Sequence, residues 1–284
     1  MSITLALVIL LAIVVGLSLG LLGGGGSILT VPLLTYVAGM DAKEAIAASL
    51  FVVGTTSVVS TIAHARHGHV QWRTGLIFGV ASMLGAFLGG LLGGFIPGTI
   101  LLIAFALMMI ATATAMLRSR KKQSGTSAKK SLPLGKILAE GLAVGLVTGL
   151  VGAGGGFLVV PALALLGGLS MPMAVGTSLL VISMKSFAGL AGYLTSVSLD
   201  WPVVLAVTAA ALVGAVIGAR LTSVVPEQAL RKGFGVFVLV MGVAVLSQEL
   251  PQPWGLVVIG AAVLTAGGLY AFRRNPHLPN TMGN

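Results

Sequence analysis

The chain is a succession of long apolar stretches, which run at residues 3–38, 42–63, 74–95, 97–117, 136–168, 172–196, 202–222, 227–247 and 254–272. A helix needs about 20 mostly apolar residues to cross the hydrocarbon core of a bilayer, and most of these stretches have that length. Only 8% of the 284 residues are charged, whereas a soluble domain carries roughly 25%. We therefore predict an all-α polytopic membrane protein with about eight to nine transmembrane segments.

Two of the stretches, 3–38 and 136–168, are too long for one crossing, and each contains a cluster of glycines. The clusters are Gly23–Gly26 and Gly152–Gly156, the second with Ala153 in it. Irregular backbone at membrane depth is tolerated only where it is buried in protein or lines a watery cavity. We expect both helices to be broken at the glycines.

The chain also resembles itself at an offset of 129 residues, at which 26 of the 86 residues from 16 to 101 are identical to their counterparts. The matched pairs include Gly23 with Gly152, Pro32 with Pro161, Ser49 with Ser178, Ser57 with Ser186, Trp72 with Trp201, Gly85 with Gly214, Gly89 with Gly218 and Pro97 with Pro226. We predict two homologous transmembrane repeats, 1–117 and 137–247, followed by a further transmembrane segment and tail at 248–284.

The repeats are joined by a basic loop, 118–136, which has seven Lys and Arg residues and no acid. Such loops lie on the cytoplasmic side, which predicts a multi-pass protein of the cytoplasmic (inner) membrane. If each glycine-broken stretch returns the chain to the side it came from, Arg66 and Arg231 also fall inside, Glu249 falls outside, and the repeats are inverted. If each stretch crosses once, Arg231 falls outside. We favour inverted repeats, with the parallel arrangement left open.

Repeats with broken helices in corresponding positions are typical of secondary transporters, whose substrate site lies near the bilayer midplane. Lys185 lies near the middle of the stretch 172–196, which contains no acid. A charge at the bilayer centre costs at least about 2.5–3.5 kcal/mol, so the counter-charge is predicted to be a bound anion. The alternatives are that Lys185 bonds carbonyls of a broken helix or is neutral.

The other residues assigned to the substrate site are glycines that can offer backbone N–H groups and hydroxyls that can donate to an anion. They are Gly23, Gly24, Gly25, Gly26, Ser27, Ser49, Thr56, Ser57, Gly152, Gly154, Gly155, Gly156, Thr177, Ser178 and Ser186. The glycines have an alternative role in close helix crossing, which is the role expected for Gly85, Gly89, Gly214 and Gly218. Hydroxyls can instead bond back to the carbonyls of their own helix.

The same residues exclude several other classes of protein. The chain has no cysteine, and His64, His67 and His69 have no acidic neighbour, so we expect no metal and no cofactor. Basic residues in short clusters between apolar stretches do not predict nucleic-acid binding, and one lysine among scattered hydroxyls does not predict an enzyme. Proton coupling would have to use Glu140, Asp200 or the histidines, and a homo-oligomer is left open.

The paired sequences Gly-Gly-Gly-Gly-Ser-Ile-Leu-Thr-Val-Pro from Gly23 and Gly-Ala-Gly-Gly-Gly-Phe-Leu-Val-Val-Pro from Gly152, with Ala-Val-Gly-Thr-Ser-Leu-Leu-Val-Ile from Ala174, resemble the TauE/SafE family over residues 3–247. The resemblance implies a transporter of about eight helices that exports sulfite or organosulfonates. The chain departs from it in a ninth stretch and in Ala47-Ala48-Ser49, where the second repeat has Gly176-Thr177-Ser178. A passive anion channel and a permease for another small solute are the alternatives.

Overall fold

The computed structural model describes residues 3–22, 27–118, 134–152, 155–161, 163, 169–221 and 227–251, and these are helical apart from short turns and connections. The elements are α1 (Ile3–Leu22), α2 (Thr30–Pro32), the short π-helix η2 (Leu33–Val37), α3 (Ala42–Arg66), α4 (Trp72–Phe95), α5 (Gly98–Arg118), α6 (Leu134–Val151), α7 (Gly156–Pro161), α8 (Met171–Tyr193), α9 (Trp201–Leu221) and α10 (Glu227–Glu249). Among the described residues, α3, α4, α8 and α9 are long and apolar enough to cross a membrane. The predicted stretch 254–272 and nearly all of the basic loop lie outside the described residues.

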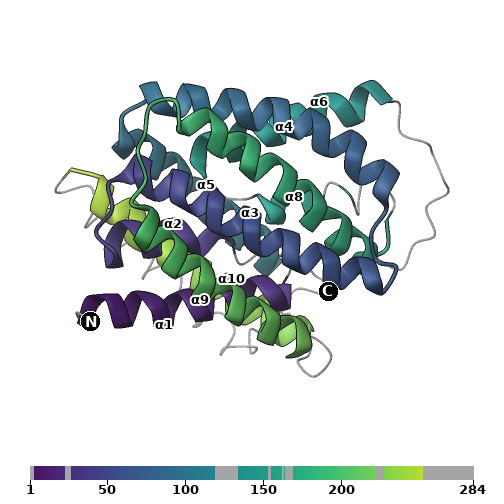
Figure 1. Cartoon of the computed structure of the whole chain (residues 1–284), viewed down its shortest axis with the longest axis horizontal. Helices are drawn as coiled ribbons and strands as arrows, with labels where there is room; N and C mark the ends of the chain where they lie inside the picture. The colour runs from purple at the N-terminus through teal and green to yellow at the C-terminus, as the bar shows by residue number, and fades with distance from the viewer. Residues whose placement is uncertain are drawn as a thin grey trace, which may run out of the picture.

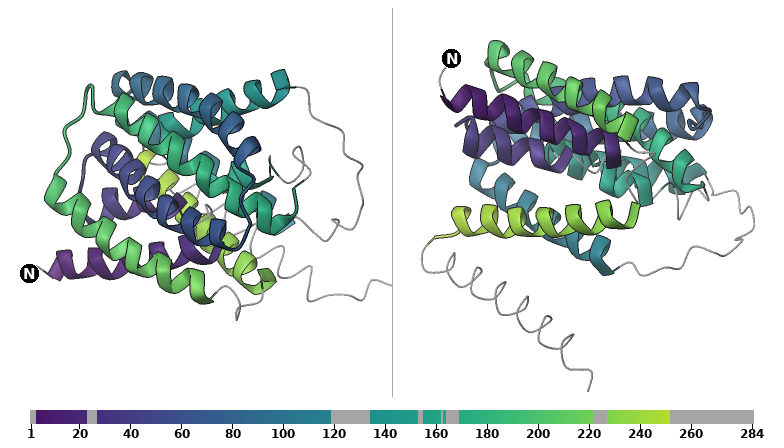
Figure 2. Two further views of the ribbon diagram at one scale, coloured as in Figure 1. Left: turned by 45° about the vertical axis from the view of Figure 1, so that its right-hand side comes forward. Right: turned by 90° about the horizontal axis from the view of Figure 1, so that it is seen from below.

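The bundle is built around α3 and α8, which cross antiparallel in its middle (Figure 1). The pair α4 and α6 covers one side of them, and the pair α1 and α9 covers the other. Helices α5 and α10 pack against each other beside this core, through Ala106, Val245 and Leu246 (Figure 2). Each of these pairs joins a helix from the first half of the sequence to one from the second.

Glycine allows the backbones of two of these pairs to touch. A Cβ atom on Gly145 of α6 would lie 2.2 Å from the carbonyl oxygen of Ser82 on α4, and one on Gly85 of α4 would lie 2.1 Å from that of Leu142 on α6. The same close approach holds for Gly89 and Gly149 in this pair and for Gly16, Gly20, Gly214 and Gly218 between α1 and α9. Small residues are the usual means of close helix packing in membranes. The crossing role expected for Gly85, Gly89, Gly214 and Gly218 is therefore confirmed.

The first broken stretch leaves one end of the bundle and returns to it. Helix α1 runs parallel to α9, since Gly16 meets Ala211 and Gly20 meets Ala215. The start of α9 lies beside the start of α3, where the Asp200 backbone N–H donates to the Glu44 carboxylate at 2.9 Å. The chain thus begins α1 at this end, turns after Leu22, and is back at the same end by Asp41, which caps α3.

The returning segment is a short helix with a widened last turn. Pro32 has no backbone N–H and interrupts the α-helical bonding pattern. The chain continues as the π-helix η2, in which the Ala38 N–H donates to the Leu33 carbonyl five residues earlier at 3.0 Å. Such π-helical turns are frequent at functional sites. In the second half, α6 ends at Val151 and α7 begins at Gly156, so this stretch is also broken at its glycines.

The two outer pairs are attached to the central helices differently. Helix α4 packs closely along α8, with backbone contacts at Gly90, Gly189 and Gly192. Helix α9 contacts α3 over a shorter region. At an offset of 129 the glycines of the close interface correspond to Ala219, Ser60 and Ala63. The glycines that let α4 approach α8 are thus replaced by larger residues in α9 and α3.

Candidate functional site

Lys185 is a fully buried lysine in the middle of the bundle. It lies on α8, is 1% exposed, and its Nζ donates to the Thr148 Oγ1 on α6 at 2.7 Å. The Thr148 hydroxyl in turn donates to the Val144 carbonyl at 2.7 Å, and so accepts from the lysine without losing its own donor bond. The side chain is held by a hydroxyl rather than by a carboxylate.

Between α6 and α7 the backbone approaches the amino group of Lys185 at Gly155. Gly152 and Gly155 have φ angles of +73° and +64°, the left-handed region that favours glycine. A Cβ atom on Gly155 would lie 2.4 Å from Lys185 Nζ and 2.3 Å from Thr148 Cγ2. Both the backbone conformation and the packing therefore require glycine at 155, and the structure brings Gly155, Lys185 and Thr148 together.

None of the six acidic residues of the chain lies on α8. Among the described residues, Thr148 is the hydrogen-bond partner of Lys185. Glu140 is on the same helix as Thr148 but eight residues earlier, about 12 Å along the axis at the rise of an α-helix. A buried charge is normally paired, but Lys185 has no protein counter-charge within the described part of the chain.

Unpartnered hydroxyls lie on both central helices. Ser57 on α3 and Ser186 on α8 are each 1% exposed, and their hydroxyls have no hydrogen-bond partner among the described residues. A Cβ atom on Gly54 would lie 3.3 Å from that of Ser186, and Ser57 follows Gly54 one turn later on the same face of α3. Both serines therefore lie where α3 and α8 cross. The hydroxyls of Thr30 and Ser82 are likewise buried without a described partner.

The remaining predicted hydroxyls already have protein partners. Thr56 donates to the Val52 carbonyl at 2.8 Å, and Ser178 donates to the Val175 carbonyl at 2.7 Å. Thr177 accepts from the Gln71 backbone N–H at 2.9 Å. Thr56 and Ser178 thus bond within their own helices, which was the alternative to substrate binding, and Thr177 holds a neighbouring segment. Ser27 is buried and Gly156 begins α7, while Gly23, Gly24, Gly25, Gly26 and Gly154 lie outside the described residues.

Ser49 fastens the glycine turn of the other half. Its Oγ contacts the Ile46 carbonyl and the Gly152 carbonyl, both at 2.7 Å, and the residue is completely buried. The bond joins α3 to the backbone of the residue that opens the turn. Ser49 therefore positions the glycine turn of the Lys185 site.

We expect Ser49→Ala to lower the melting temperature, because a buried carbonyl loses its partner, a change that costs about 1–3 kcal/mol. Thermal unfolding in detergent measures the effect. Ser183→Ala is the matched control, since Ser183 is also buried and donates only to its own helix, at the Leu180 carbonyl. Equal melting temperatures for the two variants would contradict the role given to Ser49.

Thr148 was not among the residues predicted from the sequence. It is the single hydroxyl residue between 137 and 151 and precedes Gly152 by four residues. A lone polar side chain one turn before a glycine break is a usable signal. It says nothing by itself, however, about which residue across the bundle it will meet.

The residues considered for metal binding or proton transfer lie away from Lys185. His64, His67 and His69 gather where α3 passes into α4, with ring centroids 6.0 Å apart for His64 and His69 and 6.1 Å for His67 and His69. Among the described residues, no group of three possible ligands is placed to hold a metal ion. Asp200 lies at the opposite end of the bundle, beside the start of α3.

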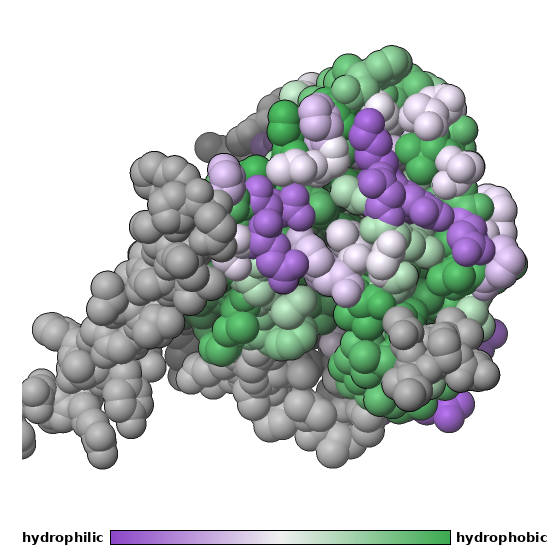
Figure 3. Space-filling model, turned by 90° about the vertical axis from the view of Figure 1, so that its left-hand side faces the viewer, coloured by the Kyte–Doolittle hydropathy of each residue, from purple (hydrophilic) through white to green (hydrophobic). Residues whose placement is uncertain are grey.

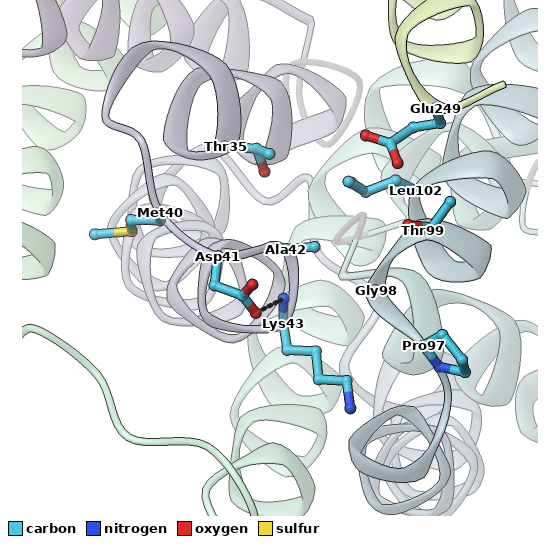
Figure 4. A pocket seen from close by; sticks show the side chains of 10 residues that line it. All are labelled: Thr35, Met40, Asp41, Ala42, Lys43, Pro97, Gly98, Thr99, Leu102 and Glu249. Atoms are coloured by element: carbon cyan, nitrogen blue, oxygen red, sulfur yellow. Dashed lines mark hydrogen bonds between the residues drawn. The ribbon is translucent and has the colours of Figure 1, made fainter. Parts of the chain in front are cut away.

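A cavity of about 510 Å³ opens at the end of the bundle where α3 and α5 begin and α10 ends. Its lining residues are Thr35, Met40, Asp41, Ala42, Lys43, Pro97, Gly98, Thr99, Leu102 and Glu249 (Figure 4). Hydrophilic side chains gather on this face of the molecule (Figure 3). The cavity contains none of the predicted substrate residues. It is an opening at one end of the bundle, separate from the buried Lys185.

Comparisons with known proteins identify the family. Residues 8–245 match the family model described as Sulfite exporter TauE/SafE. The chain is 35% identical over 240 residues to a "Probable membrane transporter protein" of Xylella fastidiosa, which covers 82% of this chain and 91% of that protein. It is 29% identical over 245 residues to the "Probable membrane transporter protein YdhB" of Bacillus subtilis, covering 84% and 99%. No solved structure matches the chain. The chain therefore belongs to the TauE/SafE family of membrane transporters.

Proposed function

We propose that this protein is a secondary transporter that moves a small anion, sulfite or an organosulfonate, outward across the cytoplasmic membrane. The observation that carries the proposal is the buried amino group of Lys185, whose one described hydrogen-bond partner is a neutral hydroxyl. The matched family model is described as a sulfite exporter, which supports the choice of substrate.

The charge of the substrate follows from the charge of the site. Removing an ammonium group from water costs several kcal/mol, which an opposite charge nearby offsets. A single lysine matches a single negative charge, and the unpartnered hydroxyls of Ser57 and Ser186 can donate to anion oxygens. Backbone N–H groups of the glycine turns would complete the site. Two separate hydroxyl donors suit an oxyanion, whose several oxygens can each accept a hydrogen bond, better than a single spherical chloride ion.

The arrangement of the helices supports a carrier made of two inverted repeats. At the offset of 129 residues, α1 corresponds to α6 and α4 corresponds to α9. Corresponding glycines form the close contacts in the pair α1 with α9 and in the pair α6 with α4. The central helices α3 and α8, which also correspond, run antiparallel (Figure 1). Inverted repeats around a midplane site allow alternating access. If the basic loop is cytoplasmic, as its charge predicts, the end of α5 and the start of α6 lie in the cytoplasm and the 510 Å³ cavity at the opposite end of the bundle faces outward.

The first test is anion flux into proteoliposomes, with sulfite, sulfate, thiosulfate, sulfoacetate and methanesulfonate in parallel and protein-free vesicles as the blank. We expect saturable uptake of sulfite or a sulfonate, competed by the other and not by chloride. Flux that does not saturate and carries chloride equally would indicate a channel. The absence of flux for every sulfur anion would overturn the substrate class.

We expect Ser57→Ala and Ser186→Ala to raise the KM for the transported anion about 5- to 10-fold, because each removes one donor to it, and a hydrogen bond is worth about 1 kcal/mol. Neither hydroxyl has a described protein partner, so the melting temperature should not fall. Thr61→Val is the control, since the Thr61 hydroxyl donates to the Ser57 carbonyl of its own helix. A KM unchanged in both serine variants would remove them from the site.

A further inference from the structure

We infer that Lys185 is also the proton carrier of the transport cycle, so that each anion crosses the membrane together with one proton. This inference rests on the proposed function, because it concerns the state of the same site when the anion has left. The proton moves as follows. The neutral amine of the empty site takes up a proton from the side on which the anion enters, and the ammonium pairs with the anion. On the other side the anion departs and the ammonium releases its proton to water.

The surroundings of Lys185 favour a neutral amine whenever no anion is bound beside it. Lys185 is 1% exposed. Its Nζ donates to the Thr148 hydroxyl and lies next to Gly155, where a Cβ atom would come within 2.4 Å of it. An isolated ammonium in such surroundings is strongly disfavoured, whereas a neutral amine is not. A neutral amine is also satisfied here, because it can donate one N–H to the Thr148 oxygen.

No acidic side chain of the described residues lies beside Lys185 to pair with its ammonium form. The helices packed against α8 are α3, α4, α6 and α7. The titratable side chains on these helices, on α8 and next to them are Asp41, Lys43, Glu44, His64, Arg66, His69, Arg73, Lys136, Glu140 and Tyr193. His69 lies beside Gly176, near the start of α8. Those on α3 and α4 lie within three residues of a helix end, or cap it in the case of Asp41. Glu140 lies about 12 Å along α6 from Thr148, and the Tyr193 hydroxyl donates to the Leu150 carbonyl.

Proton uptake and release by Lys185 determine how much net charge the transport cycle moves across the membrane. The site is neutral in both states in which it crosses between the two sides of the membrane: as the ammonium paired with its anion, and as the amine with no anion. The cycle therefore moves no net charge, and the membrane potential does not drive it. Outward movement is driven by the anion gradient, and an alkaline exterior favours it by accepting the proton.

The experiment follows efflux of methanesulfonate and, in parallel, of sulfite from proteoliposomes that contain a pH-sensitive dye. Methanesulfonate is the cleaner probe because it remains a monoanion throughout the neutral pH range. We expect one proton to leave per anion, measured as alkalinisation of the lumen, and an efflux rate that changes less than 2-fold when a potassium diffusion potential is imposed. Protein-free vesicles correct for passive permeation of protonated sulfite.

The variant Lys185→Arg tests whether Lys185 is the group that carries the proton, because a guanidinium group stays protonated in proteins and cannot release one. We expect it to exchange internal for external anion at a rate within about 10-fold of the wild type, but to lose net efflux and the lumen pH change. Lys43→Arg is the matched control, since Lys43 lies at the rim of the outer cavity and donates to the Gly94 carbonyl.

The outcomes separate the two proposals. Wild-type anion efflux without proton movement, or efflux that follows the imposed potential, would overturn the proton inference and leave the anion transporter standing. Absence of efflux for both probes would overturn both. If Lys185→Arg fails to fold, the wild-type stoichiometry still decides whether a proton moves.

Discussion

Replacing Lys185 by methionine should reduce anion flux at least about 100-fold without lowering the melting temperature. The substitution removes the described cation beside the site, and an anion buried without its partner loses about 3–5 kcal/mol, which corresponds to a factor above 100. Methionine has a similar length and no charge. Replacing a buried charge by an apolar residue of similar volume is often neutral or stabilising. Flux in proteoliposomes and thermal unfolding of the same preparation measure the two effects.

The control is Lys43→Met, which removes a lysine that lines the 510 Å³ cavity and donates to the Gly94 carbonyl at 2.8 Å. We expect it to retain flux within a few fold of the wild type. A structural lysine at 185 would give the opposite pattern, with a clear fall in melting temperature and with flux surviving in the fraction that folds. That result would remove Lys185 from the substrate site.

Gly145→Ala should destabilise the protein by about 3 kcal/mol or more, although alanine is the better helix former. Its Cβ would lie 2.2 Å from the Ser82 carbonyl oxygen and 2.8 Å from the Ser82 Cα. Both atoms belong to the backbone, so α4 and α6 must separate. Forced overpacking costs about 1–3 kcal/mol and sometimes more, and the separation also weakens the neighbouring contacts at Gly85, Gly89 and Gly149. Thermal unfolding and the yield of monodisperse protein measure the loss.

Gly135→Ala, on the same helix, should have the opposite sign. A Cβ atom there meets nothing within 4 Å. Gly135 is the second residue of α6, so alanine should gain up to the roughly 0.5–1 kcal/mol of a mid-helix position. The difference between the two variants isolates helix contact from helix propensity. Similar melting temperatures for both would mean that α4 and α6 are not in backbone contact.

The secondary structure was largely predictable because a bilayer leaves the chain few choices. Seven of the nine apolar stretches begin and end within a few residues of a described helix or broken helix pair; the end of 136–168 and the whole of 254–272 lie outside the described residues. The glycine clusters predicted both breaks, since consecutive glycines disfavour a continuous helix. The stripes led by Gly85 and Gly214 were predicted as crossing points, although the sequence did not identify their partners.

The site was less predictable, because its contacts join residues far apart in the chain. Lys185 stood out by its charge in an apolar stretch, but its partner Thr148 comes from a helix 37 residues earlier. Among the predicted hydroxyls, Thr56 and Ser178 bond within their own helices, whereas Ser49 reaches the Gly152 carbonyl across the bundle. Sequence pattern gives the face of a helix, and tertiary packing decides what that face meets.

The glycine contacts also bear on how this chain is assembled during synthesis. Each glycine stripe on α1, α4, α6 and α9 is covered by a helix from the other half of the sequence. The first half thus leaves the ribosome with its closest-fitting surfaces uncovered. Helix α4 is covered when α6 follows it into the membrane, but α1 waits until α9 has been made, almost 200 residues later. The helix packing is therefore completed only late in translation. Neither half of the chain can bury its glycine surfaces without helices from the other half.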